Sequence, residues 1–204
     1  MCDSTCKTRL SRDVNLTRLP NRIHPAMIPG MTNNAETDES RATALCKSCG
    51  LCCTGHLFVW TKLRSAELDG IQSLGVQVFR EPGRRGFNQP CPLWDGQCTI
   101  YDSPQYPRFC YTYKCKLLLK VLNENIPFPD ATGIVRDAMT MIRELETLLP
   151  ESPLENFRER LIAYLESEDS DSELLSKAQA LLSFYEEHFG VDDFFEEPGD
   201  GRSG

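Results

Sequence analysis

The stretch CKSCGLCC, Cys46 to Cys53, places four thiols within eight residues, and the last two are adjacent. Disulfides, a redox-active pair and a metal site are the three chemistries that bring sulfurs so close together. Four later cysteines complete a set of eight: Cys46, Cys49, Cys52, Cys53, Cys91, Cys98, Cys110 and Cys115. Two four-thiolate sites require eight thiols, so this pattern predicts a domain whose fold depends on what the thiols bind.

The rest of the sequence gives no sign of secretion. There is no run of about 18 apolar residues, and residues 1–20 contain no apolar signal core. We therefore expect a cytoplasmic protein without membrane contact. Because cytosolic thiols stay reduced, a dense cysteine pattern there indicates metal binding or catalysis and not a disulfide framework.

The spacing of the first four cysteines favours a metal site. Cys46-x-x-Cys49 followed by Gly50 fits the tight turn with which zinc knuckles direct two thiolates at one ion. Cys52 extends this to the Cys-x-x-Cys-x-x-Cys run of ferredoxin-type loops, whose thiolates bind separate irons of one cluster. Cys53 should leave the backbone in a different direction from Cys52. We therefore expect the first three cysteines to share a site with one later cysteine, and Cys53 to join the remaining three.

The charge of the chain is divided unevenly along its length. From Cys46 to Lys120 there are ten Lys and Arg against five Asp and Glu, whereas from Val121 onward there are six against twenty. Two four-thiolate sites, each with a formal charge of about 2−, would be offset by the first segment. The alternatives are that the basic segment docks the acidic helices or binds nucleic acid. We expect metal ions as ligands, a protein partner for the acidic helices, and no nucleic acid.

The expected architecture is α+β, with a small cysteine-rich, metal-stabilised domain of short strands and helices before an all-α C-terminal extension. Its expected parts are a flexible leader (1–40), a metal-binding domain (41–123), a helical extension (124–190) and an acidic disordered tail (191–204). Within the domain we expect strands at 57–60 and 76–79, a helix from Ser65, a hairpin turn at Asp95-Gly96 and a helix over 109–122. Apolar spacing predicts three helices in the extension, the second N-capped by Ser152 and the third by Ser170.

Two segments of the chain together resemble the CxxCxxCC cysteine-cluster family of bacteria, which is described as a zinc- or iron-chelating domain. The first is Cys46-x-x-Cys49-x-x-Cys52-Cys53, and the second is CPLWDGQCTIY followed by Pro107-Arg108-Phe109-Cys110 and Tyr113-Lys114-Cys115. The resemblance covers about Cys46 to Lys116 and implies that all eight cysteines bind metal. The chain departs from the family pattern at Tyr106, where the family has arginine, and by two extra residues between Tyr101 and Pro107.

The sequence leaves the metal and the activity open. Zinc and iron–sulfur clusters both accept four thiolates. The clusters would be four-iron cubanes, in one or two copies, and would supply a redox or group-transfer role. A structural zinc module that binds a partner without catalysis is the main alternative, and a thiol oxidoreductase is a weaker one, since no βαβ unit surrounds the motif. His24 and His188 are not expected to be ligands, whereas His56, three residues after Cys53, could replace a cysteine as a ligand or be a hydrogen-bonded or surface histidine. Cys2 and Cys6 are expected to be free thiols. No substrate or catalytic residue can be named.

Overall fold

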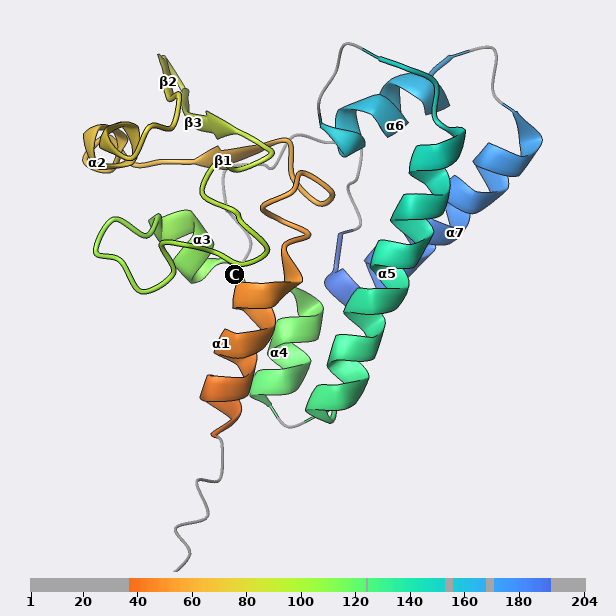
Figure 1. The fold of residues 1–204 in the computed structure, drawn as a ribbon, viewed down its shortest axis with the longest axis horizontal. Helices are drawn as coiled ribbons and strands as arrows, with labels where there is room; N and C mark the ends of the chain where they lie inside the picture. The colour runs from red at the N-terminus through yellow and green to blue at the C-terminus, as the bar shows by residue number, and fades with distance from the viewer. Residues whose placement is uncertain (1–36, 124, 153–155, 168–170, 192–204) are drawn as a thin grey trace, which may run out of the picture. The chain divides into compact units, whose positions relative to one another are not determined.

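Helices make up about half of the residues that the structure describes, and a small antiparallel sheet lies beside them (Figure 1). The computed structural model describes residues 37–123, 125–152, 156–167 and 171–191. The elements are α1 (Asp38–Cys49), β1 (Trp60–Lys62), α2 (Leu68–Ser73), β2 (Phe79–Glu81), β3 (Arg84–Asn88), α3 (Arg108–Thr112), α4 (Lys116–Leu122), α5 (Phe128–Leu148), α6 (Phe157–Leu165) and α7 (Ser172–Phe189). The fold is therefore α+β, as the sequence predicts. No helix in these ranges is both long and apolar enough to cross a membrane.

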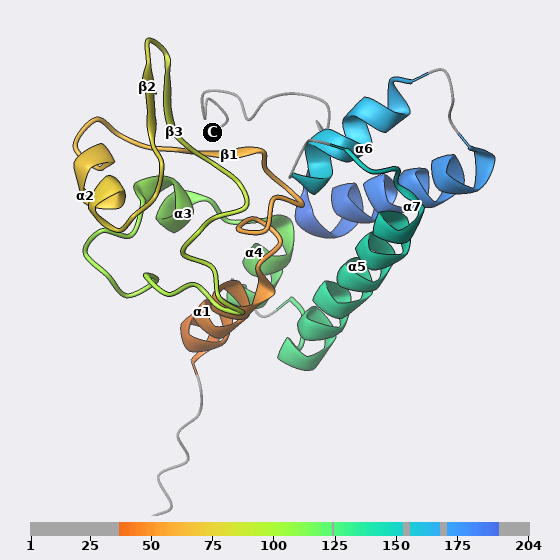
Figure 2. The same cartoon turned by 45° about the horizontal axis from the view of Figure 1, so that its top comes forward.

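The sheet has three short strands in the order β1-β3-β2, and both neighbouring pairs are antiparallel. Thr61 of β1 lies opposite Phe87 of the central strand, and Arg80 of β2 lies opposite Arg85. Figure 2 shows β2 and β3 running side by side as a hairpin. Two of the strands lie where strands were expected, at the carboxyl ends of 57–60 and 76–79, but β3 was not predicted. Its sequence, RRGFN, has no apolar alternation that would mark a strand.

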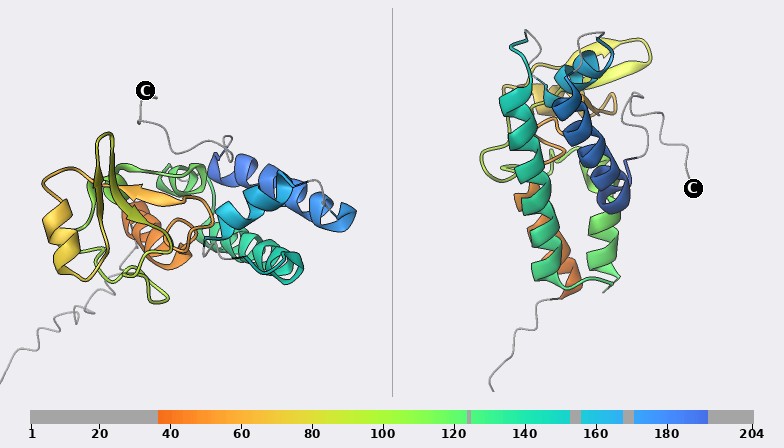
Figure 3. Two further views of the ribbon diagram at one scale, coloured as in Figure 1. Left: turned by 90° about the horizontal axis from the view of Figure 1, so that it is seen from above. Right: turned by 90° about the vertical axis from the view of Figure 1, so that its right-hand side faces the viewer.

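Two groups of buried apolar side chains form the interior. The larger one joins α1 and α4 to α5, α6 and α7 and includes Leu45, Leu118, Ile142, Leu161 and Leu181. The smaller one lies around α2 and β3 and consists of Leu63, Leu68, Ile71, Val76 and Phe87. Figure 1 shows α1 below the sheet and beside α4, next to α5, and Figure 3 shows the same helices from two further directions. The expected metal-binding domain and the expected helical extension thus share the larger core.

Helix α1 begins inside the expected leader. Thr37 is its N-cap, and the Thr37 side chain accepts a hydrogen bond of 3.2 Å from the Ser40 amide. No helix was predicted here, because Ala42 and Leu45 are the only buried apolar residues among the first eight positions of α1. The rest of the leader, up to residue 36, and the acidic tail from residue 192 lie outside the described residues.

Three helix boundaries differ from the predicted ones. The single helix expected over 109–122 is two helices, α3 and α4, because the chain is extended at Tyr113 and at Cys115, which N-caps α4. Helix α6 begins at Phe157 with Asn156 as its N-cap, and not at Ser152. Helix α7 is capped by Asp171, one residue after the predicted cap, and Ser170 itself lies outside the described residues.

Candidate metal centre

All eight cysteines singled out from the sequence line one cavity. Its volume is about 90 Å³, several times the roughly 10–15 Å³ that one water molecule needs by the same measure. Most of the remaining lining is aliphatic or aromatic, including Leu57, Phe58, Phe87, Phe109 and Tyr113. We call this space the thiol cavity.

Cys46 and Cys49 lie in the last turn of α1, three residues apart and therefore on one face of the helix. The expected zinc-knuckle turn is thus wrong, because the first Cys-x-x-Cys pair is helical. Gly50 ends the helix in the left-handed conformation, with φ of 74°. The ring of Trp94 covers it: a Cβ at Gly50 would lie 2.7 Å from Trp94 Cη2 and 2.8 Å from Cε2.

The chain turns sharply after Gly50 and presents Cys52 and Cys53. The Thr54 amide donates a 2.8 Å hydrogen bond to the Gly50 carbonyl. Cys115, which belongs to a different part of the chain, lies at the start of α4, where its Sγ accepts a hydrogen bond of 3.4 Å from the Leu118 amide. Since α4 packs beside α1 in the larger core, Cys115 comes close to the first cysteines of the run.

Backbone hydrogen bonds bring the later cysteines to the same region. The Cys91 amide donates to the Cys53 carbonyl at 2.6 Å, and the Cys98 amide donates to the Lys47 carbonyl at 3.1 Å. Trp94 and Cys98 form an isolated antiparallel bridge around the Asp95-Gly96 turn, which confirms the predicted hairpin turn.

Burial raises the pKa of every one of these thiols, and neighbouring thiols raise most of them further. Burial is the main reason that the pKa of Cys46 is raised to about 11 and that of Cys49 to about 12. Among the neighbouring thiols, Cys115 adds most to both increases. It acts in the same way on Cys52. We name Cys46, Cys49, Cys52 and Cys115 the first thiol set.

The other four cysteines influence one another in the same manner. After burial, Cys91 is the thiol that most raises the pKa of Cys53 and of Cys110, and Cys98 raises the pKa of Cys91. We name Cys53, Cys91, Cys98 and Cys110 the second thiol set. The two sets are adjacent at Cys52 and Cys53, which are joined by one peptide bond. They also influence each other elsewhere, because Cys98 raises the pKa of Cys46 and Cys46 raises the pKa of Cys53 and of Cys110.

The donor chemistry fits a thiolate-binding metal or cluster. All eight cysteines are free thiols, and each is partly buried. Within the described ranges, no three His, Cys, Asp or Glu side chains are grouped as ligands of a single metal ion. The eight thiols line a cavity of about 90 Å³. Thiolate sulfur is the donor that zinc and iron–sulfur clusters accept.

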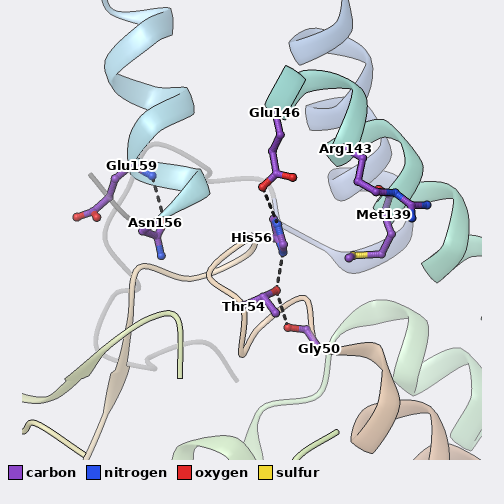
Figure 4. Close-up of polar contacts among 8 residues, drawn as sticks. All are labelled: Gly50, Thr54, His56, Met139, Arg143, Glu146, Asn156 and Glu159. Atoms are coloured by element: carbon purple, nitrogen blue, oxygen red, sulfur yellow. Dashed lines mark hydrogen bonds and ion pairs between the residues drawn. The ribbon is translucent and has the colours of Figure 1, made fainter. Parts of the chain in front are cut away.

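His56 is buried against the helices and does not line the thiol cavity. Figure 4 shows it between Thr54, whose Oγ1 lies 2.5 Å from Nδ1, and Glu146 of α5, whose Oε1 lies 3.9 Å from Nε2. Thr54 Oγ1 is also 2.9 Å from the Gly50 carbonyl. Burial lowers the pKa of His56 from 6.5 to about 4, so the ring is neutral at pH 7.

Two residues at the start of α6 hydrogen-bond to the cavity wall, and neither was singled out from the sequence. The Asn156 side chain caps the helix by accepting from the Glu159 amide at 3.2 Å (Figure 4), and its Nδ2 donates to the Phe58 carbonyl at 3.3 Å. The buried Arg158 donates from Nη1 to the Leu57 carbonyl at 2.6 Å. Both acceptors belong to residues that line the thiol cavity.

The remaining residues considered from the sequence lie apart from the thiols or outside the described ranges. His188 of α7 packs against Phe184, with ring centroids 4.3 Å apart, and does not line the cavity. Cys2, Cys6 and His24 lie outside the described residues. Tyr106 lines the cavity, and its hydroxyl donates to the Cys110 carbonyl at 3.3 Å.

Comparisons of the chain with models of protein families, with curated proteins and with solved structures find no match. The relation to the CxxCxxCC family therefore stays a prediction from the motifs.

Proposed function

We propose that this protein binds metal through its two thiol sets, four thiolates to each site, as a member of the CxxCxxCC family. The observation that carries the proposal is that eight cysteines, drawn from α1, the following turn, the Asp95-Gly96 hairpin, α3 and α4, line a single cavity. A core without a ligand has no need to gather eight thiols around a space of this size, because protein interiors are close-packed.

The arrangement favours iron–sulfur clusters over single zinc ions. A zinc ion needs four sulfurs about 2.3 Å from one point, whereas the eight thiols here line a cavity of about 90 Å³. A four-iron cluster is larger and takes each thiolate at a separate iron. The helical position of Cys46 and Cys49 also removes the knuckle turn that favoured zinc in the sequence.

Two lysines lie where they would offset the charge of bound thiolates. Burial raises the pKa of Cys46 and of Cys98, while the ammonium group of Lys114 acts against this at Cys46 and that of Lys47 acts against it at Cys98. Each thiol set therefore has a lysine near it, but Lys47 also pairs with Asp102 at 2.7 Å, and that carboxylate raises the pKa of Cys98. Such cations stabilise the thiolate form that a metal requires.

A bound iron–sulfur cluster would supply one-electron redox chemistry. The chain's own contribution would be to hold the thiols and exclude water. Phe58 packs edge-on against Phe109 and Tyr113, with ring centroids 5.7 and 4.9 Å apart, and all three rings line the cavity. A dry, aromatic wall of this kind suits electron transfer or group transfer beside a cluster.

A structural zinc module is the second candidate, and one observation favours it. Cysteines of the first thiol set pack against the larger hydrophobic core, whereas Cys91 of the second set packs against the smaller one. Metal at both sets would therefore join the two cores. In that case the bound metal would stabilise a surface for a protein partner and would carry no reaction.

The test is the content of iron, zinc and acid-labile sulfide in protein purified without oxygen. Two four-iron clusters would give about eight irons and eight sulfides per chain, and a brown solution that absorbs at about 400 nm. Structural zinc would give about two zincs and a colourless solution. Protein that contains neither metal after purification, and takes up neither on reconstitution, would refute the proposal.

Single Cys→Ser variants test the division into two sets. We expect Cys115→Ser to lose the metal of the first set and Cys98→Ser to lose that of the second, so each loses about half. Cys6→Ser is the matched control and should keep full metal content. Full metal content in either Cys115→Ser or Cys98→Ser would contradict the two-site arrangement.

A further inference from the structure

A polar pair interrupts the otherwise apolar and thiol-rich wall of the thiol cavity. Gln89 and Thr61 both line the cavity and are 7% and 2% exposed, respectively. The Gln89 carboxamide nitrogen lies 2.7 Å from Thr61 Oγ1. Neither residue was singled out from the sequence, since a lone Gln and a lone Thr carry no pattern.

One end of the Gln89 carboxamide has no partner. Its Oε1 is buried and makes no hydrogen bond. A buried amide atom left unpaired costs about 1 to 3 kcal/mol, so such atoms are rare in folded proteins unless a ligand satisfies them. Gln89 lines the thiol cavity, so a ligand bound there would lie beside this residue.

The pair is also held firmly in place. The Gln89 amide donates to the Val59 carbonyl at 2.8 Å, and the Gln89 carbonyl accepts from Asn156 Nδ2 at 3.5 Å. Thr61 is fixed in β1 opposite Phe87 of the central strand. Cys91, two residues further along the chain, donates its amide to the Cys53 carbonyl, so Gln89 adjoins the second thiol set.

The oxygen and nitrogen of a carboxamide can be exchanged by turning the group over, and Thr61 suits both orientations because a hydroxyl donates or accepts. In the turned orientation, the Thr61 hydroxyl donates to Gln89 Oε1. The NH₂ group then takes the place of the unpaired atom and needs an acceptor. The lining of the cavity offers eight sulfurs, and a metal-bound thiolate or a cluster sulfide accepts a hydrogen bond far better than a neutral thiol.

We propose that Gln89, oriented by Thr61, donates a hydrogen bond from its carboxamide to anionic sulfur at the second thiol set when that set holds metal. The inference rests on the proposed function. Gln89 is a positioning and charge-stabilising residue, and it does not bind the metal itself. A donor of this kind stabilises the more negative, reduced form of a cluster and therefore raises its reduction potential, and it also strengthens metal retention.

Four variants test the proposal: Gln89→Leu, Gln89→Glu, Thr61→Val and Thr61→Ser. Metal retained per chain is followed during exposure to a fixed concentration of a chelator, and the midpoint potential is measured if the metal is an iron–sulfur cluster. We expect Gln89→Leu and Gln89→Glu to lose second-set metal about tenfold faster. In the same two variants the midpoint potential should fall, so that the oxidised-to-reduced ratio at the wild-type midpoint rises about tenfold, which corresponds to ~59 mV for one electron. Thr61→Val should change both in the same direction, and Thr61→Ser, which keeps the hydroxyl, should match the wild type.

A purely structural role for Gln89 is separated by repeating Gln89→Leu in the Cys98→Ser background. There the second set is already empty, so the proposal predicts no further effect on first-set metal. Equal loss from both sets, or an unchanged retention and potential in Gln89→Leu at full metal content, would overturn the inference while leaving the proposed function intact. Wild-type protein without metal would instead refute the proposed function and the inference with it.

Discussion

Replacing Gly50 by alanine should destabilise the protein by about 2 to 5 kcal/mol, for two separable reasons. Gly50 has a φ of 74°, and the left-handed conformation costs an L-residue about 1 to 2 kcal/mol. The new methyl group would also meet the Trp94 ring, with Cη2 and Cε2 at 2.7 and 2.8 Å. Ordinary carbon contacts lie near roughly 3.5 to 4.0 Å, and overpacking of this kind costs about 1 to 3 kcal/mol.

Gly75→Ala is the matched control for the backbone effect. Gly75 has a φ of 86°, lies one residue beyond the C-cap Leu74 of α2, and has no atom within 4 Å of its would-be Cβ. We expect it to lose only about 1 to 2 kcal/mol. The measurement is urea unfolding of each variant, as purified, followed by the far-ultraviolet circular dichroism of the helices.

A double variant isolates the contact with Trp94. In Gly50→Ala/Trp94→Leu the ring that opposes the methyl group is gone, so the two losses should fall short of additivity by about 1 kcal/mol or more. Equal losses of unfolding free energy for Gly50→Ala and Gly75→Ala, together with additivity in the double variant, would refute the argument that the Trp94 ring packs directly on Gly50.

Three further predictions concern the surroundings of the thiols. Because burial lowers the pKa of His56 to about 4, the unfolded chain takes up its proton first as the pH falls. The contribution of the neutral His56 to stability is therefore fully present above pH 6.5 and is lost toward pH 4, by at most about 3 kcal/mol. His56→Gln should remove that part of the pH dependence of the urea midpoint. An unchanged pH dependence in this variant would contradict the prediction. Arg158→Met should lower the free energy of unfolding in urea by about 2 to 4 kcal/mol, since the Leu57 carbonyl loses its buried donor. Replacing the partly exposed Arg160 by Met should lower it by about 1 kcal/mol or less. Similar losses in the two variants would argue against the Arg158 contact. Metal uptake should weaken steeply as the pH falls, because the raised pKa values of the thiols mean that each thiol releases a proton when it binds metal. A calorimetric titration in buffers of different ionisation enthalpy should count the released protons. Metal binding without proton release would contradict thiolate ligation.

The sequence could predict that these eight cysteines lie together because thiol spacing is itself a chemical signal. The run from Cys46 to Cys53 and the turn at Asp95-Gly96 are local features, and the structure brings both to the same cavity. Which later cysteine joins the first three could not be predicted, since Cys115 reaches them only through the packing of α4 beside α1. Their role as metal ligands stays a prediction.

The polar residues around the cavity could not be predicted for a different reason. Gln89, Asn156 and Arg158 are single residues, and their roles depend on partners distant in the chain, such as Thr61, Phe58 and Leu57. No periodicity or motif marks them. The break between α3 and α4 was missed because a cysteine as N-cap is less common than Ser, Thr, Asp or Asn.

The attachment of α6 to the cavity wall has a consequence for the biosynthesis of the protein. The eight cysteines are made before residue 116, but Asn156 and Arg158, which bond the carbonyls of Phe58 and Leu57, follow much later in the chain. During translation the cysteine segment therefore emerges from the ribosome without the contacts that complete its wall. A chain shortened before Asn156 would keep all eight cysteines and lack both of these hydrogen bonds.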